Sequence, residues 1–134
     1  MTPFAEIAYV RLPLNISGSI PGALRADDNL EFLKGTLDVL VLKALSFGPR
    51  HGYSVARWVD DATNGALQIE EGALYHALHR LEKKGAVKSE WGVSESNRRA
   101  RYYTLTAAGR KQFAVKTETW TRYAEAVFAA LRTA

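Results

Sequence analysis

The sequence predicts a mainly α-helical fold with a small β-hairpin and a long C-terminal helix. Three observations support this prediction. Apolar residues recur with helical spacing in three successive segments, two short alternating segments follow, and a heptad pattern closes the chain. The length of 134 residues favours one domain. We divide it into an N-terminal arm (residues 1–29), a three-helix and hairpin body (30–105) and a terminal helix (106–134).

The composition excludes several classes of function. The chain has no cysteine, which rules out disulfides and thiolate chemistry. No apolar run reaches the roughly 18 residues that span a bilayer, and the first residues lack a secretory pattern, so we expect a cytoplasmic protein. Paired carboxylates, a nucleophile with a base and a phosphate-binding glycine loop are all missing, so we expect neither an enzyme nor a cofactor. The net charge of +4 favours an anionic partner only if the positive charges share one face.

The arm and the first two helices can be placed from prolines, glycines and apolar spacing. Residues 1–29 contain three of the four prolines and no helical periodicity, which predicts an extended arm. The first helix is expected over residues 36–47, with Thr36 as N-cap and Gly48 at its end. The second is expected over residues 53–63 and ends at Asn64 and Gly65. We expect His51, in the turn between them, to be satisfied locally or to contact a phosphate.

The third helix, expected over residues 70–84, has two unlike faces. One face is apolar, and the opposite face contains no acid. His76 and His79 on that face could supply half of a metal site, but no cysteine or carboxylate joins them, so we expect no metal. The residues of this non-acidic face are Gly72, Tyr75, His76, His79, Arg80 and Lys83.

A β-hairpin is expected next, because the period changes from helical to alternating. Residues 86–91 and 102–105 form the two expected strands, and a polar loop joins them. The alternation turns Tyr103 and Leu105 inward and Tyr102 outward. Arg98, Arg99 and Arg101 then lie at or near the tip of the hairpin.

The last helix begins after Thr106, a good N-cap, and continues to about residue 132. Its apolar and small residues are spaced by four and three in alternation, which is the seam of a coiled coil. A second copy of the same helix in a two-fold dimer would cover this seam, and the alternative is that the helix folds back on its own domain. The seam residues are Phe113, Thr117, Trp120, Ala124, Val127 and Leu131.

The order of three helices, strand, basic loop, strand and long helix is the layout of a winged helix-turn-helix. In that layout the third helix enters the major groove of DNA and the hairpin, or wing, contacts the backbone. Phosphates between the clustered arginines would relieve their mutual repulsion, and the hydroxyl of Tyr102 could donate to a phosphate. The alternative is a winged-helix module that binds protein, for which an apolar third-helix face would be expected. The predicted DNA contacts are Tyr53, Ser54, Gly72, Tyr75, His76, His79, Arg80, Lys83, Arg98, Arg99, Arg101 and Tyr102.

Four phrases of the sequence resemble the PadR family of transcriptional regulators. They are LKGTLDVLVLKAL (33–45), GPRHGYSVA (48–56), EEGALYHALHRLEKKGAV (70–87) and RRARYYTLTAAGR (98–110). The resemblance implies a homodimeric, usually repressing, regulator of a palindromic operator, in the subgroup with a single C-terminal helix. It also implies a small aromatic effector bound between the terminal helices, against Trp120. His76 replaces the proline that is common in the family phrase, and the arm before residue 30 is longer than usual.

Overall fold

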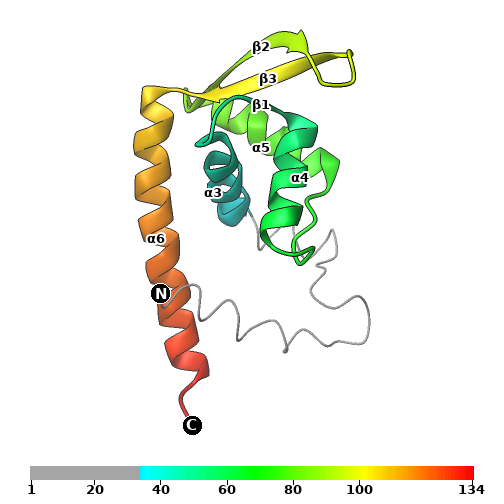
Figure 1. Ribbon diagram of the computed structural model, residues 1–134. Coiled ribbons are helices and arrows are strands. Elements are labelled where there is room, and N and C mark those ends of the chain that lie inside the picture. The colour runs from blue at the N-terminus through cyan, green and yellow to red at the C-terminus, as the bar shows by residue number, and fades with distance from the viewer. Residues whose placement is uncertain (1–33) are drawn as a thin grey trace.

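The computed structural model describes residues 34–134, so the expected arm lies outside the described residues. Figure 1 shows the arrangement of the elements, with α6 along one side and the paired strands β2 and β3 at one end of the molecule. The mainly α fold with a small sheet is confirmed. The elements are α3 (Lys34–Leu45), β1 (Arg50–His51), α4 (Gly52–Ala62), α5 (Glu71–Lys83), β2 (Val87–Val93), β3 (Arg99–Leu105) and α6 (Ala107–Leu131).

The three short helices form where the apolar periodicity predicts them, with ends that shift by one or two residues. Thr36 is a correction, because α3 already includes it and its hydroxyl accepts a hydrogen bond from elsewhere in the chain. The cap of α4 is the side chain of His51, whose Nδ1 accepts from the backbone N–H of Ser54 at 3.2 Å. This confirms that His51 is satisfied locally. Gly85 follows α5 with φ +76°, a left-handed conformation that glycine adopts without strain.

The sheet has three strands rather than the two expected. Its order is β1-β3-β2, and both pairings are antiparallel. The two-residue strand β1 was missed by the sequence analysis, and β2 and β3 are longer than predicted. As a result Arg99 and Arg101 lie within β3, and only a short turn around Ser94–Arg98 remains as the tip of the wing.

The core lies between α3, α4, α5 and the inner face of the sheet. Leu42, Leu45, Leu78 and Leu81 are almost completely buried there. Tyr103 and Leu105 from β3 are each 6% exposed, which confirms that they anchor the wing. Burying such side chains is the main source of stability, at about 25 cal/mol per Å² of apolar surface.

The junction between the wing and α6 is tightly built around Thr106. Its hydroxyl accepts from the backbone N–H of Gly109 at 2.9 Å and donates to the carbonyl of Gly85 at 2.6 Å, which confirms the predicted cap. A Cβ atom at Gly109 would collide with the carbonyl oxygen of Ala86. Only glycine therefore fits at this position, and α6 leaves the sheet in one fixed direction.

The predicted seam of α6 is divided between two surroundings. Phe113 packs against the core, and Ala124 is 7% exposed. The indole N–H of Trp120 donates to the hydroxyl of Thr36 in α3 at 2.7 Å. The sequence analysis predicted a dimer interface for these residues, with packing on the chain's own domain as the alternative, and the bond to Thr36 joins Trp120 to α3 of the same chain. Val127 and Leu131, at 38% and 73% exposure, remain open.

Candidate nucleic-acid interface

The non-acidic face of α5 is turned away from the core. Gly72, Tyr75, His76, His79 and Lys83 are all exposed, whereas Leu74 and Leu81 on the other side are buried. The helix carries two cationic side chains, Arg80 and Lys83, in its last turn, where the helix dipole favours positive charge. Within residues 34–134, no group of three His, Asp or Glu side chains is arranged to hold a metal ion.

Arg80 differs from the rest of this set. Its Nη2 donates to Oδ1 of Asp38 at 2.6 Å, and the Asp38 side chain is only 7% exposed. A buried carboxylate needs such a partner, because an unpaired charge in the interior is costly. In the chain without DNA, Arg80 thus forms an ion pair that joins α5 to α3.

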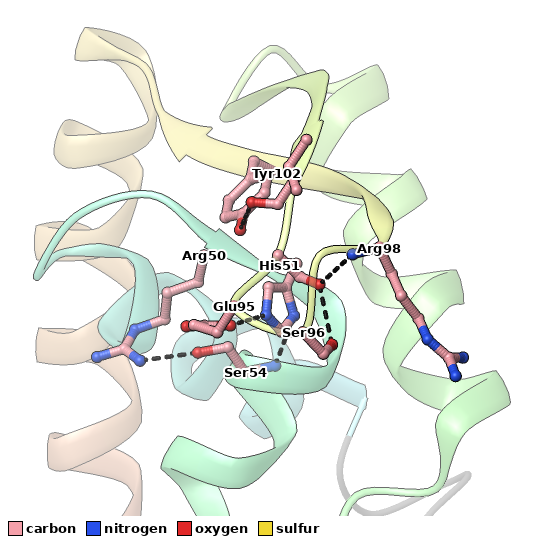
Figure 2. Close-up of polar contacts among 9 residues, drawn as sticks. Arg50, His51, Ser54, Glu95, Ser96, Arg98 and Tyr102 are labelled. Atoms are coloured by element: carbon pink, nitrogen blue, oxygen red, sulfur yellow. Dashed lines mark hydrogen bonds and ion pairs between the residues drawn. The ribbon is translucent and has the colours of Figure 1, made fainter.

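The three arginines of the wing have three different surroundings. Figure 2 shows the side chain of Arg98 pointing away from the polar contacts at the tip. The guanidinium of Arg99 lies over the ring of Trp91, 4.3 Å from its centroid. Arg101 is drawn toward α5, as its Nε donates to the hydroxyl of Ser89 at 2.9 Å. The arginine cluster is therefore not one uniform patch of free charge.

A small polar network ties Arg101 to α5. The hydroxyl of Ser89 donates to Oε2 of Glu82 at 2.7 Å, and Nη2 of Arg101 lies 3.7 Å from the same oxygen. Glu82 and Ser89 were not among the predicted site residues. Glu82 and Ser89 are seven positions apart in the sequence. Their pairing becomes visible only once α5 and β2 are packed together.

Tyr102 lies on the outer face of the wing, as predicted, but its hydroxyl is already used. The O–H donates to the carbonyl of Val93 at 3.0 Å. The ring lies so close to Gly92 that a Cβ there would meet it at 2.9 Å, and its edge contacts the ring of His51. In the unbound chain Tyr102 therefore holds the wing together, and the phosphate contact expected of it would require this bond to break.

A second polar network surrounds the start of α4 (Figure 2). Arg50 donates to the hydroxyl of Ser54 at 3.0 Å, and Nε2 of His51 lies 3.4 Å from Oε1 of Glu95 at the wing tip. A hydrogen bond from its own backbone, and then the one from His51, hold the pKa of Glu95 below its ordinary value. Tyr53, in the first turn of α4, is 66% exposed.

A cleft of about 460 Å³ opens between the inner face of the wing and the first turns of α4 and α5. Tyr53 from α4, Tyr75 from α5 and Arg99 from β3 meet at this cleft, although they are far apart in sequence. Trp91, which the sequence analysis did not assign to the site, also lines it. The cleft joins three of the elements on which DNA contacts were predicted. Its lining residues are His51, Gly52, Tyr53, Tyr75, Trp91, Arg99, Ala100, Arg101 and Tyr103.

Three helices followed by a β-hairpin with a basic inner face define the winged helix-turn-helix class. Several solved structures of transcriptional regulators are similar to this chain. One is a transcriptional regulator from Clostridium thermocellum, 31% identical, with a TM-score of 0.67 over 74% of this chain and 96% of that one. Another is a PadR family regulator from Eggerthella lenta, 30% identical, with a TM-score of 0.65 over 81% and 93%.

The chain belongs to the PadR-like family of transcriptional regulators, whose model matches residues 41–115. This confirms the resemblance seen in the sequence. An uncharacterized protein from Lysinibacillus sphaericus is 27% identical over 97 residues, which is 72% of this chain and 89% of that protein. An uncharacterized transposon protein from Streptomyces fradiae is 36% identical over 90 residues, but the match spans only 24% of its length. In the described part of this chain, no helix has the length and apolar character needed to cross a membrane.

Proposed function

We propose that this regulator is a repressor that binds a palindromic DNA operator as a homodimer, reading bases with α5 and clamping the backbone with its wing. The observation that supports this most directly is the cleft, where side chains of α4, α5 and the wing converge. Phosphate contacts would supply affinity and position, and contacts of α5 in the major groove would supply sequence preference.

The outward side chains of α5 suit base recognition. Tyr75, His76 and His79 are exposed, and their face of α5 carries no acidic side chain. Arg80 is left out of the base-reading set, because it neutralises Asp38. We therefore assign sequence preference to Tyr75, His76 and His79, and we assign affinity to Lys83, Arg98 and Arg99.

Homodimerisation is supported by four exposed residues of α6, Val115, Tyr123, Val127 and Leu131, which we call its outer face. They follow a row of residues four apart that meets the predicted seam at Val127 and Leu131. These four apolar side chains are between 38% and 73% exposed. An apolar strip of this kind on a regulator favours pairing with a like surface. Two copies joined here would present two α5 helices to two half-sites at fixed spacing.

An aromatic effector between two Trp120 side chains fits this arrangement less well. Trp120 is directed to Thr36 of its own chain, and the neighbouring hydroxyl of Thr117 is buried without a hydrogen-bond partner. We therefore base the proposal on DNA binding and pairing alone. Release by a small molecule remains a prediction taken from the family resemblance.

Selection of bound duplexes from a random pool, followed by affinity measurements on the selected and on an unrelated duplex, tests the proposal. We expect His76→Ala to reduce the ratio of the two affinities by about ten-fold, since a lost base contact costs about 1–3 kcal/mol. Arg98→Ala should instead weaken both duplexes alike.

Lys111→Ala on α6 is the control, because it removes one exposed cation that lies on neither α5 nor the wing. A wild-type chain that binds no duplex at low salt would contradict the proposal. It would favour a winged-helix module that binds another protein.

A further inference from the structure

Trp91 is a large aromatic side chain that the fold itself does not need. It is 55% exposed on β2, beyond the part of the sheet that covers the core. Val87, four residues earlier on the same face of the strand, is 2% exposed and belongs to the core. A tryptophan that remains so open on a short hairpin calls for a role other than burial.

The pairing of the strands places Trp91 on the same face of the wing as two arginines, whose guanidinium groups lie over its ring. Trp91 is opposite Arg101, and Arg99 is the diagonal neighbour on the same face. The guanidinium of Arg99 lies 4.3 Å from the ring centroid, and that of Arg101 lies 5.7 Å away. The three side chains share the wall of the cleft that faces Tyr53 and Tyr75.

The positive charges of Arg99 and Arg101 are not equally available to a ligand. Arg101 is shared with Ser89 and with the carboxylate of Glu82. Among residues 34–134, no carboxylate forms an ion pair with Arg99, and its guanidinium lies over the ring of Trp91. The free positive charge on the inner face of the wing is thus concentrated at Arg99.

We propose that Trp91 is a positioning residue that holds Arg99 in the cleft as a ligand for a backbone phosphate of DNA, while Arg101 tethers the wing to α5 and binds no phosphate. This inference depends on the proposed DNA-binding function and assigns the parts of the wing within it. The DNA backbone is the expected occupant because the cleft opens between the wing and the base-reading helix.

The physical reason lies in the shape of the guanidinium group. Stacked on an indole ring, it is attracted by the negative face of the ring, and its N–H groups remain free at the edge. Those N–H groups can form two parallel hydrogen bonds to a phosphate. A side chain held in this way loses less conformational freedom when it binds, so its contact with the phosphate is stronger.

Salt titrations of duplex binding distinguish these roles. The variants are Arg99→Ala, Arg101→Ala, Trp91→Ala and Trp91→Phe. Lys88→Ala is the matched control, because Lys88 is an exposed cation on β2 that faces the opposite side of the wing. Each is measured by fluorescence anisotropy on the selected duplex over a range of salt concentrations.

We expect Arg99→Ala to lower the slope of log affinity against log salt by about 0.9 for each wing that contacts DNA. Arg101→Ala and Lys88→Ala should leave the slope unchanged. Trp91→Ala should weaken binding about three-fold, and Trp91→Phe should retain most of the affinity, since phenylalanine also attracts a cation. In the Arg99→Ala background, Trp91→Ala should have no further effect.

Two results would overturn the inference while leaving the proposed function intact. One is an equal loss of slope in Arg99→Ala and Arg101→Ala, which would make both arginines phosphate ligands. The other is additive losses from Trp91→Ala and Arg99→Ala, which would show that Trp91 acts independently. Failure of the wild-type chain to bind any duplex would instead reject the DNA-binding function, and this inference with it. Because Trp91 is 55% exposed, we expect Trp91→Ala to fold, so that its binding can be compared directly with that of Trp91→Phe.

Discussion

The two faces of α6 carry similar residues but have opposite surroundings. On the inner face, Phe113, Trp120 and Ala124 are covered by the chain's own domain. On the outer face, Tyr123 and Leu131 are exposed at 66% and 73%, although Leu131 lies on the same side of the helix as Phe113, five turns further along. The difference shows that apolar spacing identifies a helix that needs cover but does not identify what covers it.

The geometry of the helix explains how both faces can exist. Successive residues are rotated by 100°, so a row of residues four apart gradually winds around the helix, and here the exposed row meets the seam at Val127 and Leu131. Within the seam, Phe113 packs against the core and Trp120 is bonded to Thr36 of α3, while Val127 and Leu131 continue the same seam toward the C-terminus. In Figure 1, α6 extends beyond α3 toward the C-terminus. The first strip stabilises the fold, and the second is available for pairing.

The largest expected effect comes from breaking the inner face. Trp120→Ala should lower the free energy of unfolding by about 3 kcal/mol, because it leaves a cavity between α6 and α3 and removes the bond to Thr36. Denaturant unfolding at low protein concentration measures this. Tyr123→Ala, three residues further along the same helix but exposed, is the control and should change the unfolding free energy by less than about 0.5 kcal/mol. Similar losses in both variants would remove the distinction between the faces.

The outer face is tested by adding charge where pairing is proposed. Val127→Lys combined with Leu131→Lys should weaken the dimer by about 2 kcal/mol or more, because a lysine in an apolar contact must be desolvated. Sedimentation equilibrium measures the dissociation constant, and the domain itself should unfold as in the wild type. Glu118→Lys, on an exposed polar part of the same helix, serves as the charge control. A wild-type chain that is monomeric at micromolar concentration would reject pairing through this face.

A smaller change isolates the polar contact of the inner face. Thr36→Val keeps the size of the side chain but removes the hydroxyl that accepts from the indole of Trp120. The loss should be about 1 kcal/mol, because the half-buried N–H is left without this partner. The same substitution in a Trp120→Phe background should cost almost nothing, since phenylalanine has no N–H to satisfy. Equal losses in both backgrounds would mean that Thr36 stabilises α3 in another way.

The smallest effect is expected at the wing tip, which, unlike the inner face of α6, is held by polar contacts. The pKa of Glu95 is lowered from 4.5 in the folded chain, first by its own backbone and then by His51. The stability that the ionised Glu95 contributes is therefore present above pH 4.5. It disappears as the pH falls through the lower pKa of Glu95 in the folded chain. The melting temperature of Glu95→Gln should be slightly below that of the wild type at neutral pH, and the two should converge in acid. A difference that grows in acid would contradict the assignment.

Most of the fold could be predicted because its signals are local. Thr106, Gly65 and Gly85 mark helix ends by properties of single residues, and Tyr103 and Leu105 follow from alternation. The strand β1 could not be found, since two residues carry no period and form a strand only by pairing with β3.

The candidate site was harder to predict because its contacts join distant parts of the chain. Arg80 and Asp38 are 42 positions apart, and Arg101 meets Ser89 across the hairpin. The sequence shows that each arginine is positively charged, but it does not show which carboxylate or hydroxyl binds it. The position of Trp91 under Arg99 depends on the register of β2 and β3, which the sequence does not specify.

The tight junction at Gly109 and the packing of α6 on α3 make the terminal helix a lever. A helix of 25 residues is about 37 Å long, so a tilt of about 5° at its far end displaces the other end by about 3 Å. In a dimer joined through the outer face, such a tilt would move the DNA-binding part of the chain, residues 34–105, which we call the head. The two move together because no loop intervenes between Thr106 and the sheet. A movement of 3 Å is close to the rise of one base pair. The spacing of the two heads, and with it the match to one operator, would therefore be set by the angle at which two helices cross far from the DNA.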